Sequence, residues 1–554
     1  MNTLILADLE NQPEARQEHY EEKHPEKVTG FERFKLGYLR LLDKMMGRRT
    51  VVIGVYALVC ALLIGIGFTQ IGQDMMPRQN HAHQFQVRIV GPQGLRIERT
   101  EALTKRVIKQ ISDIVGPQNI AISSAFVGMT PSSYGTSALY VFNAGPHEAV
   151  LQVNLSEDYK VESLDALKEQ VRQRIRQKMP NVRLSFEPID LTDKIMSQGA
   201  QTPIEILVGG KDLIEGQHYA NRLLTRLREI PYLRDLRINQ PLSYPTVSVK
   251  VDRERAAQLG LSTDEISKSL VAATSSSRFT AKNLWLDQSK GFAYQVQIQL
   301  EQDQMKSVAD IQAIPLVKGQ LRPTLGDVAT ITPTTIPGQY DRIGPRRIIT
   351  VSANINNRDL GTATRDVQAA ITAAGDPPKG SVVELRGLAQ LLQETLSSLQ
   401  FGLGLAIVVI FLLLAANYQS FKVASVVLVS IPAVLAGALT LLLVTGQTLN
   451  LQSYMGIIMS VGVSVANALL LVTNAESLRL RYRDARAAAR VAGAARLRPI
   501  LMTALAMIAG MIPMASGLGE SGEQTAPLGR AVIGGLLFST VAALLILPVV
   551  FAAV

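Results

Sequence analysis

The chain has 554 residues, with 56 Lys and Arg against 46 Asp and Glu, a net charge of +10. Charged residues make up 18% of it, below the roughly 25% of soluble proteins, and the mean hydropathy is +0.17. These values exclude an intrinsically disordered chain, and a single Cys excludes a disulfide scaffold or a Cys-rich metal site. Almost purely apolar stretches instead alternate with ordinary soluble sequence.

The first predicted element is an amphipathic helix in residues 31–49. Helical spacing places Phe34, Tyr38, Leu41 and Met45 on one face between basic residues. A helix of this kind is typical of the membrane surface.

Six segments are apolar enough to cross a membrane, which takes about 20 residues. None has a charged residue or His in its apolar interior, and the first follows a charged stretch rather than opening the chain as a signal peptide would. The segments are residues 50–68, 401–416, 423–446, 454–472, 499–516 and 531–554.

Charge predicts the orientation of these spans. Residues 31–49 and 473–498 together hold 13 basic and 4 acidic residues, so by the positive-inside rule both face the cytoplasm. Residues 70–398 then lie outside. Because the basic residues concentrate beside the membrane, they do not indicate nucleic-acid binding.

The outside region repeats a strand, an amphipathic helix and a second strand. Such βαβ units predict small α+β subdomains. The four units begin with the strands at residues 84–90, 149–155, 203–208 and 348–355, and residues 244–340 are expected as an insertion between the third and fourth.

The expected organisation has seven parts. These are a cytoplasmic segment with an interfacial helix (1–49), a span (50–69), a first porter subdomain (70–200), the first part of a second porter subdomain (201–243), a docking-type insertion (244–340), the second part of that subdomain (341–398) and five spans (399–554). The predicted fold class is an α-helical six-span half-bundle with a large α+β domain of paired βαβ, ferredoxin-like subdomains.

Several motifs resemble the second half of resistance-nodulation-division efflux permeases. They are MPRQNHAHQFQVRIVGPQGLRIERT ending at Thr100, YDRIGPRRIITVSANINNRDL at residues 340–360, GIIMSVGVSVANALLLV at 456–472 and, most specifically, RLRPILMTALAMIAGMIP at 496–513. The resemblance covers essentially the whole chain, whereas full permeases of this family are about twice as long.

The resemblance implies secondary active efflux of small molecules by proton antiport across a Gram-negative inner membrane. It implies a homotrimer of the full permease, with a periplasmic adaptor protein, an outer-membrane channel, the permease's N-terminal half and membrane lipid as partners. It implies no enzyme activity, cofactor, resident metal or nucleic-acid partner. The alternative from another class is a membrane-anchored periplasmic binding or sensing module without transport.

Departures from the family pattern concern the proton pathway. Ala466 stands where many drug-exporting relatives carry a lysine, and the family's paired aspartates belong to the first half. A proton carrier within the membrane must titrate, and these spans offer no such side chain. The chain is therefore expected to be a fragment or a split-gene product that does not couple to protons alone, with small-residue faces at Gly456, Gly462 and Ala466 packing against the other half.

Three residues are candidates for a proton relay through the resemblance: Asn467, Thr503 and Arg496. Asn467 is the most polar residue at mid-span, and it either joins the relay or links helices through a hydrogen bond. Arg496 either reaches the relay or, like Arg498, anchors the cytoplasmic end of its span.

Substrate contact is expected from the loop after the strand at 120–127. Phe126, Met129 and Tyr134 lie in FVGMTPSSYGT, and aromatic and Met side chains suit adaptable apolar pockets. An ordinary surface turn is the alternative. A metal site at His81 and His83 is disfavoured because no third ligand stands near in sequence.

Overall fold

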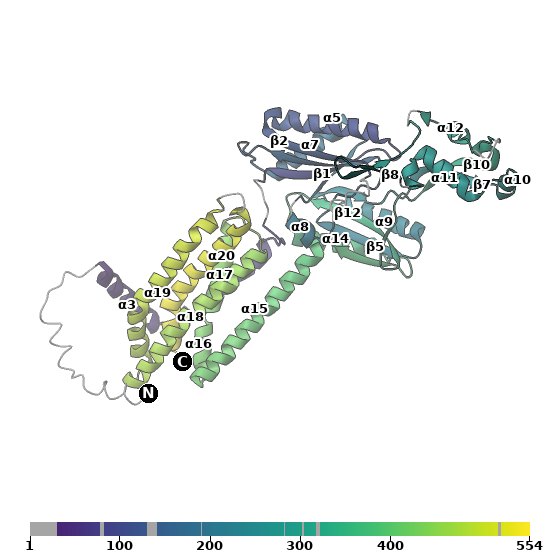
Figure 1. The fold of residues 1–554 in the computed structure, drawn as a ribbon. Helices are drawn as coiled ribbons and strands as arrows, with labels where there is room; N and C mark the ends of the chain where they lie inside the picture. Colours follow the sequence, from purple (N-terminus) through teal and green to yellow (C-terminus); the bar gives the residue numbers. More distant parts are fainter. Residues whose placement is uncertain are drawn as a thin grey trace. The chain divides into compact units, whose positions relative to one another are not determined.

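The computed structural model describes residues 30–77, 82–129, 141–189, 191–281, 283–301, 304–316, 322–518 and 522–554. Its contacts divide into two compact units (Figure 1). A helical unit comprises residues 1–82, 357–368 and 388–554, and an α+β unit comprises residues 83–356 and 369–387. Each is described by itself.

Six helices in the described part of the helical unit are long and apolar enough to cross a membrane. This confirms the predicted membrane protein with a large α+β part. Several helices are longer than the predicted apolar segments, because polar turns at their ends extend them. They are α4 (Arg49–Gln70), α15 (Leu388–Tyr418), α16 (Phe421–Leu428) with α17 (Ser430–Val444), α18 (Leu451–Tyr482), α19 (Ala485–Ser516) and α20 (Gly522–Val541) with α21 (Leu547–Phe551).

Helices α17 and α20 form the centre of the helical unit. They cross where Gly437 and Gly534 meet, so closely that a Cβ on either would strike the other's backbone carbonyl. Gly456 of α18 packs in the same way on Leu528 and Ala531 of α20. The expectation that Gly456 faces a missing half is therefore wrong, because α20 of this chain already covers it.

Two other small residues on α18 remain uncovered, as predicted. Gly462 has no neighbour within 4 Å of a Cβ placed on it, and Ala466 is exposed. On α19, Gly510 is equally open. Small residues let helices approach closely in a membrane, so these faces can accept a further helix.

A proline accounts for the distortion at the end of α20. Pro548 lacks an N–H, so it cannot bond the carbonyl of Leu544 four residues before it, and residues Ala542–Ile546 adopt a π-helical turn. The hydroxyl of Tyr38 donates to that freed carbonyl at 2.8 Å.

Tyr38 belongs to α3 (Gly30–Gly47), which forms where the amphipathic helix was predicted. Its buried residues are Tyr38, Leu42 and Met46, spaced four apart, and α3 contacts α19 and α21. Of the predicted face, Tyr38 is buried whereas Phe34 and Leu41 are exposed, and the place of this face at a membrane surface stays a prediction. Tyr38, Leu42 and Met46 pack against other helices, which leaves Phe34 and Leu41 available to a membrane surface.

The first subdomain of the α+β unit consists of β1 (Gln84–Val90), α5 (Ile97–Val115), β2 (Ile120–Val127), β3 (Glu148–Leu155), α7 (Leu164–Lys178) and β4 (Arg183–Glu187). Its sheet is antiparallel with the order β2-β3-β1-β4. The buried side chains of α5 and α7, such as Val107, Ile111, Val171 and Ile175, form its core.

The second subdomain repeats this βαββαβ order. It consists of β5 (Ile204–Gly210), α9 (Leu213–Leu227), β6 (Leu233–Ile238), β12 (Arg346–Ile355), α14 (Leu360–Ala373), of which residues 369–373 belong to this unit, and β13 (Val382–Arg386). Strand β12 pairs with β5 and β6, and β13 pairs with β5. A short strand β11 (Asp341–Ile343) forms a hairpin with β12 at the sheet edge.

Between β6 and β11 the chain leaves this sheet and builds a separate small core. Its elements are β7 (Tyr244–Val251), α10 (Arg253–Gln258), α11 (Thr263–Thr274), β8 (Asn283–Asp287), β9 (Phe292–Val296), α12 (Val308–Gln312), α13 (Leu325–Val328) and β10 (Ala329–Ile336). Strands β7 and β10 pair antiparallel, and Leu261, Ile266, Leu316, Leu325 and Val328 are buried in the core.

Candidate functional site

The main sheet of each subdomain in the α+β unit carries buried polar side chains on one face. In β1, Gln86 and Arg88 alternate with Phe85, Val87 and Ile89, because successive side chains of a strand point to opposite faces. All of these are buried. Strand β12 does the same with the buried residues Thr350, Ser352 and Asn354. Buried polar faces of this kind require partners.

Arg88 is the centre of the polar face in the first subdomain. Its guanidinium forms ion pairs with Glu187 of β4 and, at 3.1 Å, with Glu148 of β3. Burial lowers its pKa, but Glu187 and Glu148 more than offset this, so the pKa of Arg88 is raised overall. Arg88 Nη1 also donates to the carbonyl of Phe142 at 2.7 Å and thereby holds the backbone of that aromatic residue.

Arg237 of β6 is a buried cation with incomplete pairing. One Nη atom donates to Gln201 at 3.0 Å and lies 3.8 Å from Glu187, while Nε has no hydrogen-bond partner among the described residues. Burial lowers the pKa of Arg237, and the positive charge of Arg88 lowers it further, with Glu187 opposing. A buried guanidinium with a free donor favours a ligand that carries an acceptor.

Glu205 of β5 is the corresponding buried acid. Its carboxylate accepts from the backbone N–H of Gln201 at 2.8 Å. Burial raises its pKa to about 7, against smaller opposing contributions from that hydrogen bond and from Arg237. Near neutral pH Glu205 therefore exists in both protonation states.

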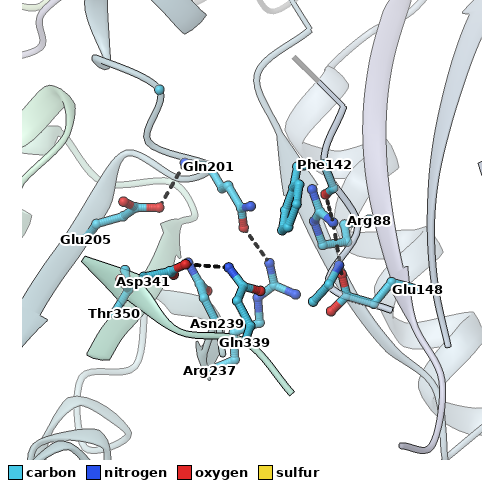
Figure 2. Close-up of a pocket in the computed structure, with 12 residues that line it drawn as sticks. Arg88, Phe142, Glu148, Gln201, Glu205, Arg237, Asn239, Gln339, Asp341 and Thr350 are labelled. Atoms are coloured by element: carbon cyan, nitrogen blue, oxygen red, sulfur yellow. Dashed lines mark hydrogen bonds and ion pairs between the residues drawn. The ribbon is translucent and has the colours of Figure 1, made fainter. Parts of the chain in front are cut away.

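These groups line one cavity of about 140 Å³ between the two subdomains. Figure 2 shows the Arg237 guanidinium in the middle of it, directed toward Gln201, with Arg88 and Phe142 on the other side. Asp341 and Gln339 complete the wall near Thr350. A second hollow of about 310 Å³ shares Arg88, Phe142 and Gln201 and extends to Lys194. The geometry is that of a small polar binding site.

Asp235 joins the two subdomains beside this cavity. It lies at φ 54° in a β-bulge of β6, where the register with β12 shifts. Its carboxylate accepts two hydrogen bonds from Arg172 of α7, at 2.9 and 2.8 Å, and one from Asn354 at 2.8 Å. Because Arg237 follows two residues later, this anchored bulge fixes the strand that carries it.

We expect Glu205→Gln to change how stability depends on pH. In the folded chain Glu205 binds a proton up to about pH 7, whereas the unfolded carboxyl releases it near its ordinary value of 4.5. The stabilising contribution of Glu205 to the free energy of unfolding is therefore fully present below pH 4.5 and is lost as pH rises to 7. The free energy of unfolding of the variant should not show this decline, which in the unchanged chain amounts to about 3 kcal/mol by pH 8.

Denaturant unfolding of the chain in detergent, followed by circular dichroism between pH 5 and 8, measures this difference. Equal pH slopes for Glu205→Gln and the unchanged chain would contradict the raised pKa.

Known proteins share this architecture. A model of the AcrB/AcrD/AcrF family matches residues 9–554. The chain belongs to this family. Membership confirms the resistance-nodulation-division permease inferred from the motifs at residues 340–360, 456–472 and 496–513.

Two curated relatives match nearly the whole chain, and a third matches just over half of it. The cation efflux system protein CzcA of Alcaligenes sp. is 28% identical over 533 residues, covering 93% of this chain and 48% of the relative. The cobalt-zinc-cadmium resistance protein CzcA of Cupriavidus metallidurans is 28% identical over 531 residues, with the same coverage. The swarming motility protein SwrC of Bacillus subtilis is 30% identical over 325 residues, covering 57% of this chain and 30% of the relative.

Solved structures show the same fold. The X-ray crystal structure of a heavy metal efflux pump, crystal form II, has a TM-score of 0.80 at 21% identity and covers 94% of this chain and 51% of that one. The chain thus spans about half the length of the CzcA relatives and of this solved permease.

The expected substrate-contact residues of this family member are not those of the cavity. Phe126 is half-buried in β2 and Met129 is exposed after it, and neither is among the residues that line the cavity. Tyr134 lies outside the described residues. Phe142 supplies the aromatic surface instead, held by Arg88.

No hydrogen bond links the expected relay residues to one another in the described part of the chain. Asn467 is half-buried without a hydrogen bond to the described residues, so the structure shows no helix-linking bond from it. Thr503 is exposed and donates to the carbonyl of Ile500 on its own helix at 3.0 Å. Arg496 is half-buried. Their role in a relay stays a prediction.

Metal ligands do not cluster in the described parts of the chain, where no group of three or more His, Cys, Asp or Glu side chains could hold a metal ion. Of the carboxylates at the cavity, Glu148 pairs with Arg88, whereas Glu205 and Asp341 accept hydrogen bonds from Gln201, Gln240 and Gln339. His83 Nε2 donates to the carbonyl of Tyr159 at 2.9 Å, and His81 lies outside the described residues.

Proposed function

We propose that this chain supplies one half of a permease that exports metal cations. The observation that carries the proposal is the match along 93% of the chain to relatives named for cation efflux and for cobalt, zinc and cadmium resistance. These names favour metal cations over the small organic molecules expected from the sequence. Since the chain spans about half of each relative, transport belongs to the whole permease.

The polar cavity is the proposed place where this half meets cargo in transit. Its walls come from two subdomains, and its charged groups, Arg237 and Glu205, are buried yet incompletely compensated. A site that must both admit and release cargo needs to bind it with moderate affinity. Incompletely paired groups can provide this, because they gain hydrogen bonds from a ligand, whereas fully paired groups would gain none. Cation ligands beyond Glu205 and Asp341 would come from elsewhere in the permease or from groups that accompany the cation.

Energy for export would come from proton antiport through carboxylates on the other half. The six spans of this chain contain no Asp, Glu, His, Lys or Arg in their apolar interiors, and a proton carrier at that depth must change charge near neutral pH. The further elements of the proposal are an inner-membrane location with the α+β unit in the periplasm, a trimer of the full permease, and an adaptor protein and an outer-membrane channel as partners.

Deletion of the coding region in its host tests the proposal. The deletion strain should become more sensitive to cobalt, zinc and cadmium salts, and a plasmid copy should restore tolerance. A copy with Arg237→Ala should fail to restore it, whereas one with Arg106→Gln, which alters an exposed residue of α5, should succeed.

Unchanged metal tolerance would contradict the cation assignment. Sensitivity to organic dyes alone would return the substrate to the small-molecule class, and no transport phenotype at all would favour the binding or sensing module.

A further inference from the structure

A third hollow of the α+β unit, separate from the polar cavity and from the hollow that extends to Lys194, is lined by four cations and no acid. It has a volume of about 570 Å³ and lies at the end of β5 and the β11–β12 hairpin. Its charged residues are Lys211, Arg342, Arg346 and Arg347, and the rest of its lining is Gly210, Pro345 and Gly380. The four basic residues are all exposed.

None of these four side chains forms an ion pair with a described residue, in contrast to other basic residues of the same unit. Arg172 pairs with Asp235 and Arg88 with Glu187, and even exposed residues such as Lys105 find a carboxylate. Arg347 instead lies over the ring of Tyr340, 5.0 Å from its centroid, which orients the guanidinium without neutralising it.

Strand pairing brings two of the cations together. Arg342 and Arg347 are register partners across the hairpin, and like charges directly opposed on neighbouring strands are destabilising. On its other side Arg347 is opposite Gly210, which offers no side chain to compensate. A local arrangement that opposes stability in this way is typical of a functional site.

Nearby acids are engaged elsewhere. Asp341 precedes Arg342 but accepts from Gln240 and Gln339 and lines the polar cavity. Asp212 follows Lys211 but caps α9, accepting from Ile214 N at 2.7 Å. Among the described residues, neither of these two acids therefore neutralises the four cations.

We propose that Lys211, Arg342, Arg346 and Arg347 form a docking site for an acidic segment of a partner protein. Exposed ion pairs are individually weak, so a single small anion would not stay bound to such an open surface. Several carboxylates on one segment can engage all four cations at once, and arginine pairs carboxylates with two parallel hydrogen bonds. This inference does not depend on what the permease transports.

Fluorescence anisotropy of a labelled polyglutamate peptide tests the site on the full chain in detergent micelles. Binding should saturate and weaken with salt. The variant Arg342→Gln with Arg347→Gln should bind about tenfold more weakly. The matched control, Arg106→Gln with Lys109→Gln, removes the same charge from exposed positions of α5 and should stay within about twofold.

The thermal midpoint of the Arg342→Gln, Arg347→Gln variant should equal or exceed that of the unchanged chain, because the opposed charges are gone. This separates lost binding from lost folding. Equal weakening in the control variant would overturn the proposal. So would displacement of the peptide by inorganic phosphate at equal charge concentration, or binding of anionic phospholipid vesicles through these arginines without binding of the peptide.

Discussion

Replacing Asp235 by alanine should destabilise the association of the two subdomains by about 3 kcal/mol, because the buried Arg172 loses its bidentate carboxylate partner and keeps only the ion pair with Glu169 at 3.3 Å. Arg172 and Asp235 are 9% and 5% exposed, and the same carboxylate also binds Asn354. Alanine additionally loses the tolerance that Asp and Asn have for the left-handed backbone at φ 54°.

Hydrogen exchange of the peptides that carry β4 and β6 measures this effect. Asp235→Asn keeps the shape and the backbone preference but removes the charge, so it should show a smaller loss. Arg226→Gln breaks an exposed pair with Glu229 and should change little. Protection of β4 and β6 that is unaffected by Asp235→Ala would refute the assigned role of the bulge.

Gly534→Val should prevent the helical unit from packing. A Cβ at this position would lie against the carbonyl of Gly437 and the side chain of Leu441, and backbone cannot yield as a flexible side chain would. Overpacking of this kind costs roughly 3 kcal/mol, and here it separates the two central helices. Size-exclusion chromatography and trypsin resistance of the detergent-solubilised chain should show the loss.

Gly462→Val is the matched control on α18. Nothing lies within 4 Å of a Cβ there, so the isolated chain should tolerate valine. If both variants behaved alike, the close packing of α17 on α20 would not be what holds this unit together.

Much of the secondary structure could be predicted because its periodicity is strong. The strands at residues 84–90 and 120–127 have the predicted bounds, since apolar residues or their alternation mark them clearly. The spans were found but their ends were not, because α15 starts at Leu388 and α18 continues to Tyr482 through polar turns that carry no hydropathy signal.

The cavity was missed although part of its signal was present. Gln86 and Arg88 stand on one face of an alternating strand, as do Thr350 and Ser352 in TVSAN, and such polar positions read equally well as a solvated face. Only the fold shows that they are buried. The bulge at Asp235 was not visible at all, because LRDLRI reads as an uninterrupted strand.

The most direct test of the central claim, half of a permease without a proton carrier of its own, is reconstitution of the purified 554-residue chain into liposomes under a proton gradient. Asn467, Ser464 and Thr503 can form hydrogen bonds but do not change charge near neutral pH, so protons have nothing in these spans to act on. We predict no accumulation of zinc or cobalt above the level of empty liposomes. Accumulation against a gradient that collapses on addition of an uncoupler would contradict the account.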